Sequence, residues 1–150
     1  MTNSQKLYNK KRHLEILELE KNSQVLTQEQ KTELLNYECR LEDYIFWIDR
    51  HHYVILLNNF NLELMKCEEF QFAYHQLWYQ SMKHISSIDK NPIELRNIRI
   101  SNSKNSFEFS SIITAIVRSF DELSNEEILY EEFKQYIQTS TRKIKRNYKI

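Results

Sequence analysis

The chain contains no glycine in 150 residues, a single proline (Pro92) and only two alanines, Ala73 and Ala115. Without glycine it has no glycine-rich loop that could hold a phosphate, which excludes P-loop and dinucleotide-binding motifs. Isoleucine, asparagine and lysine are abundant instead. Because these three residues use AT-rich codons and Gly, Pro and Ala use GC-rich ones, the composition indicates an AT-rich genome, such as that of a plastid, an endosymbiont or a low-GC bacterium.

Cysteine and long apolar runs are also scarce. Cys39 and Cys67 are the only cysteines and lie far apart in the sequence, so we expect reduced, half-buried thiols rather than a disulfide. The apolar runs, such as Val54–Leu57, are far shorter than the roughly 20 residues of a membrane span. The N-terminal segment lacks the apolar stretch of a secretory signal. We therefore expect a protein that stays soluble in the compartment where it is made.

Apolar residues recur at helical spacing along most of the chain, which predicts an all-α fold. One stripe contains Phe70, Ala73, Tyr74, Leu77, Trp78 and Ile85, and the cleanest one contains Phe109, Ile112, Ile113, Ile116, Val117, Phe120 and Leu123. A helix face that carries several aromatic rings has to be covered by other helices. The strand signal is negligible, and residues 86–105, which include Pro92, are predicted to form a loop.

Several polar segments predict where helices begin. Thr27–Gln30 and Ser124–Glu127 each have the spacing of an N-terminal capping box. The helix that follows Ser124 is expected to bury Leu129, Phe133, Tyr136, Ile137 and Ile144. Asp49–His52 is predicted to be a corner between two helices, although a single bent helix over residues 28–61 is an alternative that the spacing leaves open.

We therefore expect an antiparallel four-helix bundle over residues 51–141. Residues 1–50 form an N-terminal helical extension, in which two helices make a hairpin that lies against the bundle. Residues 142–150 form a basic C-terminal tail that frays.

Residues that could carry out catalysis or bind metal do not form a recognisable motif. Asp49 and His52 have a spacing compatible with a metal ion, but no Glu-x-x-His pair accompanies them. His75 and His84 fall on one side of a helix and are predicted to lie at the edge of the core. No nucleophile elbow or cysteine-protease pattern surrounds any Ser or Cys. The sequence therefore predicts a protein that is not an enzyme and uses no metal or cofactor.

The 21 basic and 21 acidic residues balance overall but are unevenly distributed. Residues 121–138 carry six acidic residues and one lysine, whereas residues 139–150 carry five basic residues and no acid. The candidate partner-binding residues are Asp121, Glu122, Glu126, Glu127 and Glu131. They could form a patch that docks a basic protein surface, or they could simply be solvated carboxylates that favour a helix N-terminus.

Four segments together resemble the colicin D-type immunity protein family. They are LLNNFNLELMKCEEF (56–70), HQLW (75–78), IITAIVRSFDEL (112–123) and SNEEILYEEFKQYI (124–137). In that family a short helix ends near a Phe, an acidic-aromatic Glu-Phe opens the next helix, a Leu-Trp follows, and an acidic stretch precedes the last helix. Asn61 stands where the family has a small residue or glycine, and this chain is neutral where such inhibitors are acidic.

The resemblance implies a helical bundle that binds a tRNA-cleaving toxin domain and blocks its basic cleft. Asp121 matches the family's Asp after the final core Phe, and Glu126–Glu132 match its acidic stretch. The chain is also similar to uncharacterised plastid-encoded proteins of red algae. The similarity implies a location in the plastid stroma if the protein is plastid-encoded and in the bacterial cytoplasm otherwise. A plastid-encoded domain could have been reused to bind another partner.

Two further hypotheses come from the residues themselves. The basic segment at 142–149 could make the chain an RNA-associated structural protein. A small molecule could bind among Tyr74, Trp78 and Phe120, although core packing explains these rings better.

Overall fold

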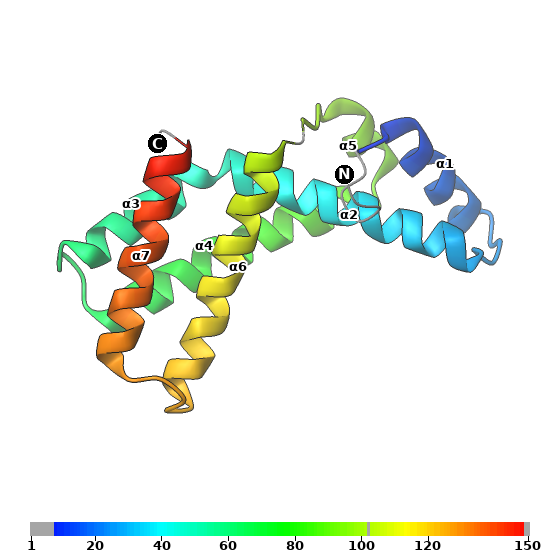
Figure 1. The fold of residues 1–150 in the computed structure, drawn as a ribbon. Helices are drawn as coiled ribbons and strands as arrows, with labels where there is room; N and C mark the ends of the chain where they lie inside the picture. The colour runs from blue at the N-terminus through cyan, green and yellow to red at the C-terminus, as the bar shows by residue number, and fades with distance from the viewer. Residues whose placement is uncertain (1–7, 102, 149–150) are drawn as a thin grey trace.

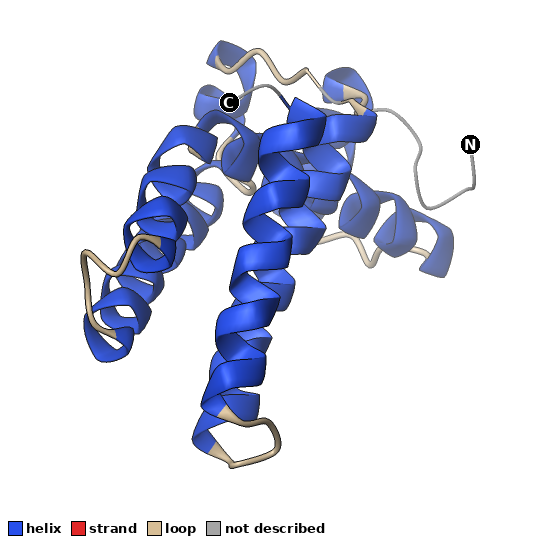
Figure 2. Cartoon of the chain, turned by 60° about the vertical axis from the view of Figure 1, so that its left-hand side comes forward, coloured by secondary structure: helices blue, strands red, loops and turns tan. Residues whose placement is uncertain are grey.

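The computed structural model describes residues 8–101 and 103–148. Within these residues it contains seven α-helices and no strand, which confirms the all-α class (Figure 2). The helices are α1 (Lys10–Lys21), α2 (Gln28–Ile48), α3 (Arg50–Asn61), α4 (Cys67–Ile88), α5 (Pro92–Asn97), α6 (Lys104–Ser124) and α7 (Tyr130–Tyr148). No helix in this part of the chain combines the length and the apolar character that a membrane span requires.

The prediction of a loop over residues 86–105 is wrong at both ends and in the middle. α4 continues to Ile88, α6 begins at Lys104, and the short helix α5 lies between them. The Asn91 side chain accepts hydrogen bonds from the Ile93 and Glu94 N–H groups and so caps α5. Pro92 occupies the first helical position, where its missing N–H group would have no partner within the helix.

The predicted corner at residues 49–52 is confirmed. Asp49 separates α2 from α3, and its carboxylate Oδ2 accepts a hydrogen bond from the Ser81 hydroxyl on α4 (2.9 Å). The Ser81 oxygen also lies 2.9 Å from the buried Tyr53 hydroxyl. The corner is thus tied to α4 by a chain of three polar side chains.

α2 and α4 pack against each other in the middle of the molecule and extend from there towards its two opposite ends (Figure 1). At one end they are accompanied by α1 and α5, which also contact each other. At the other end, α3 contacts α4 and α7, and α6 contacts α2 and α7. α6 and α7 form a long antiparallel hairpin, and the C-terminal end of α7 lies near the α2–α3 corner (Figure 1).

A chain of aromatic rings forms the centre of the core. It joins Phe60 on α3, Phe70 and Tyr74 on α4, Phe120 on α6 and Phe133 on α7, with ring centroids 4.5–5.9 Å apart. All five rings are buried. The Tyr74 hydroxyl donates a hydrogen bond to the Ile113 carbonyl of α6 (2.9 Å), so this buried polar group is satisfied.

α1 buries Ile16 and Leu17 in the core and makes polar and aromatic contacts with α2. Arg12 makes a two-pronged ion pair with Glu33 of α2, at 2.8 and 3.2 Å. The fully buried His13 stacks on Tyr37 of α2, with centroids 5.8 Å apart, and its Nδ1 is hydrogen-bonded to the Tyr8 hydroxyl (2.7 Å). Burial lowers the pKa of His13 to about 4.

Three helices end in the same way without glycine. Ser23, Glu63 and Glu126 follow the C-caps of α1, α3 and α6 with φ of 61°, 58° and 60°. In each case two N–H groups beyond the helix bond back to carbonyls of its last turn, which is the Schellman arrangement. Glycine usually occupies this left-handed position because a side chain there costs about 1–2 kcal/mol.

We predict that Ser23→Gly stabilises the protein by about 0.5–1 kcal/mol. Relief of the left-handed backbone cost of about 1–2 kcal/mol outweighs the extra freedom that glycine gives the unfolded chain. The change in the free energy of unfolding is measured by urea denaturation of the wild type and the variant. As a control, Ser86→Gly inside α4 should destabilise by a similar amount. A lower free energy of unfolding for Ser23→Gly would contradict the prediction that the left-handed backbone at Ser23 is strained.

We also predict that His13 makes the protein sensitive to acid. The unfolded chain takes up a proton on this ring near pH 6.5, whereas the folded chain does so only near pH 4. The stabilising contribution is therefore present above pH 6.5 and is lost as the pH falls from 6.5 towards 4, at up to about 1.4 kcal/mol per pH unit.

The measurement is the free energy of unfolding of the wild type and of His13→Phe between pH 7 and 4.5. The variant should lose less stability over this range than the wild type. Removal of the exposed His84 by His84→Gln provides the control and should leave the wild-type slope unchanged. Parallel curves for wild type and His13→Phe would contradict the prediction.

Candidate functional site

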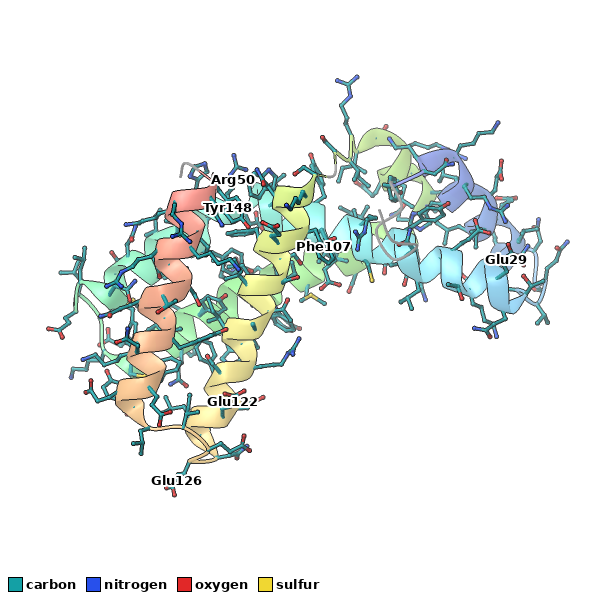
Figure 3. All side chains as sticks on the ribbon, in the orientation of Figure 1. Glu29, Arg50, Phe107, Glu122, Glu126 and Tyr148 are labelled. Carbon is teal, nitrogen blue, oxygen red and sulfur yellow. The ribbon has the colours of Figure 1, made fainter. Side chains whose placement is uncertain are left out.

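The five candidate residues lie together at the end of the α6–α7 hairpin, which we call the acidic tip. Asp121 and Glu122 are in the last turn of α6, Glu126 and Glu127 are in the connection, and Glu131 is in the first turn of α7. All five side chains are exposed, and none forms an ion pair with another described residue. Figure 3 shows Glu122 and Glu126 at this end, far from Glu29 on α2.

The turn at the acidic tip is organised by its backbone. The Glu127 N–H donates to the Glu122 carbonyl (2.8 Å), and the Glu126 N–H donates to the Leu123 carbonyl (3.1 Å). The predicted capping box at Ser124–Glu127 is therefore wrong, because these residues end α6 instead of starting α7. The residues that occupy the first turn of α7 are Glu131 and Glu132, and Glu132 accepts a hydrogen bond from the Leu129 N–H (3.1 Å).

Two apolar residues, Leu129 and Tyr130, precede Glu131 in the chain, and the Lys134 ammonium lies over the Tyr130 ring, 5.6 Å from its centroid. Leu129 is 70% exposed and Tyr130 is 44% exposed, whereas Phe133, one turn further along, is fully buried. The prediction that Leu129 lies on the buried side is wrong, because the residue precedes the helix and its side chain does not follow the helical stripe. The acidic tip thus combines exposed negative charge with exposed apolar surface.

A groove of ≈ 310 Å³ lies between α6 and α7 next to the acidic tip. Its charged lining residues are Arg118, Glu122 and Glu132, and Tyr136 also lines it. Burial raises the pKa of Tyr136. One cation and two carboxylates give this groove a mixed charge, unlike the acidic tip itself.

The residues considered for metal binding or catalysis do not converge on a site. Asp49 is engaged by Ser81, and His75 is exposed with its ring 5.1 Å from that of Phe120. Cys39 and Cys67 are free and half-buried, as predicted. Across residues 8–101 and 103–148, no three His, Cys, Asp or Glu side chains are grouped so that they could hold a metal ion. Of the rings considered for a small-molecule site, Tyr74 and Phe120 are buried in the core.

The basic segment is a continuation of α7 rather than a frayed tail, at least as far as Tyr148. Ile144 and Tyr148 are buried, and the Tyr148 ring contacts Trp47 and Phe109. The cations Arg142, Lys143, Lys145 and Arg146 are exposed on this helix, and Lys149 lies outside the described residues. α7 thus carries acids at its first turn and cations at its last, which its dipole favours.

Comparison of this chain with protein-family models, curated proteins and solved structures finds no significant match.

We predict that the apolar surface at the acidic tip adds little to stability. Leu129→Ser should change the free energy of unfolding by less than about 0.5 kcal/mol, because this side chain is largely exposed. Phe133→Ala, one turn further along, should cost about 3–5 kcal/mol because it leaves a cavity among the core rings. Chemical denaturation of both variants makes the comparison. A cost above 1.5 kcal/mol for Leu129→Ser would show that Leu129 is a structural residue.

Proposed function

We propose that the chain is a non-enzymatic protein-binding domain that uses the acidic tip to occupy a basic cleft on a partner protein. The partner of best fit is a nuclease-type toxin domain, since the chain resembles the colicin D-type immunity proteins, and binding would then block the toxin's active site. No metal or cofactor takes part. As a protein of this class, the chain would act in the plastid stroma if it is encoded in a plastid and in the bacterial cytoplasm otherwise.

The observation that carries the proposal is that five exposed carboxylates without ion pairs to other described residues and the exposed Leu129 side chain lie together at the end of the α6–α7 hairpin. Tightly binding protein surfaces often place an aliphatic or aromatic anchor at the centre and polar groups around it. The anchor contributes most of the affinity after desolvation, and the surrounding charges select the partner. Here the apolar side chain and the carboxylates are both exposed at the same end of the α6–α7 hairpin.

A basic nuclease cleft complements this surface. Such a cleft uses Lys and Arg to bind phosphates, and exposed carboxylates can replace the phosphates there. Opposite charges also speed the encounter of the two proteins, and this acceleration weakens as salt screens the charges. The acidic tip can compete for the cleft because its carboxylates lack internal partners among the described residues.

The finer architecture belongs to the same proposal. We interpret α3, α4, α6 and α7 as the antiparallel bundle of the immunity-like domain (51–141), with α1 and α2 as its N-terminal hairpin. This interpretation is supported by the contacts of α3 with α4 and α7, by those of α6 with α7, and by the Phe70–Phe120 ring contact between α4 and α6. α2 also packs on α6, so this helix contributes to the same core.

The competing explanation is that the acidic residues serve the helices alone. Carboxylates in the first turn of α7 interact favourably with its dipole, which accounts for Glu131 and Glu132. It does not account for Asp121 and Glu122, which lie at the C-terminal end of α6, where the dipole disfavours anions. Binding of a basic partner explains why these two residues are acidic, whereas helix stability does not.

The test is capture of a partner with the whole chain as bait, followed by measurement with the purified partner. Glu127→Lys combined with Glu131→Lys should weaken binding at least about a hundredfold, because two attractive charges become repulsive. Leu129→Ser should weaken it about tenfold by removing the anchor. Isothermal titration calorimetry gives these affinities, and an RNA-cleavage assay shows whether the partner is a nuclease that the chain inhibits.

The matched control reverses two acids at the other end of the molecule. Glu18→Lys combined with Glu29→Lys changes the net charge equally, and Glu29 occupies the first turn of α2 as Glu131 does that of α7. This control should retain binding. Equal loss in both double variants would point to a non-specific charge effect, and unchanged capture by the Glu127/Glu131 variant would reject the acidic tip as the binding surface.

A further inference from the structure

A second groove, of ≈ 380 Å³, lies between α3 and α7 towards the basic end of α7. Asn58, Asn61 and Leu62 line it from the α3 side, and Gln138, Thr141, Arg142 and Lys145 line it from α7. Asn61 and Thr141 join the two walls, because the Asn61 Nδ2 donates to the Thr141 hydroxyl oxygen (2.9 Å). The Thr141 hydroxyl in turn donates to the Ile137 carbonyl (2.7 Å). A side-chain hydrogen bond thus joins the two walls of the groove.

The chemistry of this lining favours an anion. Arg142 and Lys145 supply positive charge, while Asn58 and Gln138 supply amide N–H donors. No carboxylate is among the side chains that line the groove in the described part of the chain. Neither cation forms an ion pair with any other described residue. The cations are therefore available to a ligand.

Positive charge continues beyond the groove. Lys143 and Arg146 are exposed on the same end of α7. Arg50, at the start of α3, stacks on Trp47 with its guanidinium carbon 4.4 Å from the ring centroid, and Trp47 contacts Tyr148 at the end of α7. Figure 3 shows Arg50 and Tyr148 close together. A ligand with several phosphates in a row could use both the groove and this surface.

We propose that the α3–α7 groove binds the phosphodiester backbone of a single-stranded nucleic acid. One phosphate lies between Arg142 and Lys145, where guanidinium and ammonium groups both donate charge-assisted hydrogen bonds. The Asn58 and Gln138 amides donate to the sugar and phosphate oxygens beside it, which positions the strand without reading its sequence. Neighbouring phosphates lie along Arg146 and Arg50. The proposal does not depend on the function of the acidic tip.

The deciding variant is Gln138→Glu, which adds a carboxylate to the groove and changes neither the size of the side chain nor any cation. The new carboxylate lies four residues before Arg142 on the same helix, so it can pair with that cation and also repel a phosphate. Gln135→Glu makes the same chemical change on α7 outside the groove. We expect Gln138→Glu to weaken binding about tenfold and Gln135→Glu to change it less than about twofold.

The probe is a fluorescein-labelled oligouridylate of about ten nucleotides, within the usual site size for single strands. Fluorescence anisotropy with the full-length chain gives its affinity at several salt concentrations. With one phosphate neutralised in the groove and at least one more beside it at Arg146 or Arg50, log K should fall with log salt with a slope of about −1.4 or steeper. Arg142→Gln combined with Lys145→Gln should remove most of the binding. Lys143→Gln combined with Arg146→Gln, with the same loss of charge outside the groove, should remove less.

Three results would overturn the proposal. The first is absence of binding by the wild type at low salt. The second is an equal loss in the two double variants, which would mean diffuse attraction to the basic end of α7 without use of the groove. The third is competition by uridine 5′-monophosphate or inorganic phosphate at the same phosphate concentration as the oligomer, which would indicate a site for a small phosphorylated molecule. Circular dichroism and thermal unfolding should show that all these exposed-residue variants remain folded.

Discussion

The contact of Tyr74 with Phe70, Phe120 and Tyr53 is the packing interaction on which the rest of the structure depends. Tyr74 is fully buried near the middle of α4, and its ring meets rings from α3 and α6 as well as Phe70 on its own helix. The offset and edge-on arrangements at 5.3–5.7 Å are those that aromatic quadrupoles favour. Its hydroxyl is bonded to the α6 backbone, so the ring can be buried without an unsatisfied polar group. This cluster fixes where α6 and α3 lie, and these two helices position the two grooves.

The fold separates charge along α7 while the chain as a whole stays neutral. Phe133, Ile137 and Ile144 bury one face of this helix, which forces its polar residues outward at both ends. The acidic tip is formed where α7 begins, and the basic groove is formed where α7 lies against α3. About three helical turns, roughly 16 Å, separate Glu131 from Arg142, so each surface can attract its own partner with little interference from the other in physiological salt. The net charge of zero gives no indication of either surface, because the acidic and basic residues cancel in the sum.

The lack of glycine affects how the helices end. Ser23, Glu63 and Glu126 accept a left-handed backbone because the Schellman hydrogen bonds satisfy carbonyls that would otherwise be unpaired. At the acidic tip the strained residue is itself a carboxylate. The turn that ends α6 therefore projects Glu126 and Glu127 into solvent and places Leu129 ahead of α7. The absence of glycine has thereby left Glu126, a carboxylate of the candidate binding surface, at the left-handed position.

The sequence by itself determined the helical class, the Thr27–Gln30 capping box, the corner at Asp49 and the position of the five carboxylates near one turn. These features are local, since they depend on side-chain spacing of three to four residues and on hydrogen bonds between near neighbours. The stretch Ser124–Glu127 fits two assignments. Ser124 with Glu127 three residues later matches an N-terminal capping box, whereas in the structure Asn125 is the C-cap of α6, so that α7 begins only after Leu129.

Only the tertiary structure decided the features that join distant segments. The burial of His13 against Tyr37, the bond between Asn61 and Thr141, and the groove shared by Asn58 and Arg142 each bring together residues that are tens of positions apart. Sequence periodicity shows which face of a helix is buried but not which helix covers it, because many pairings bury the same apolar area. The specific pairing is selected by ring geometry and by the few polar groups that must find partners in the interior, and those conditions can be met only when all the helices are in place.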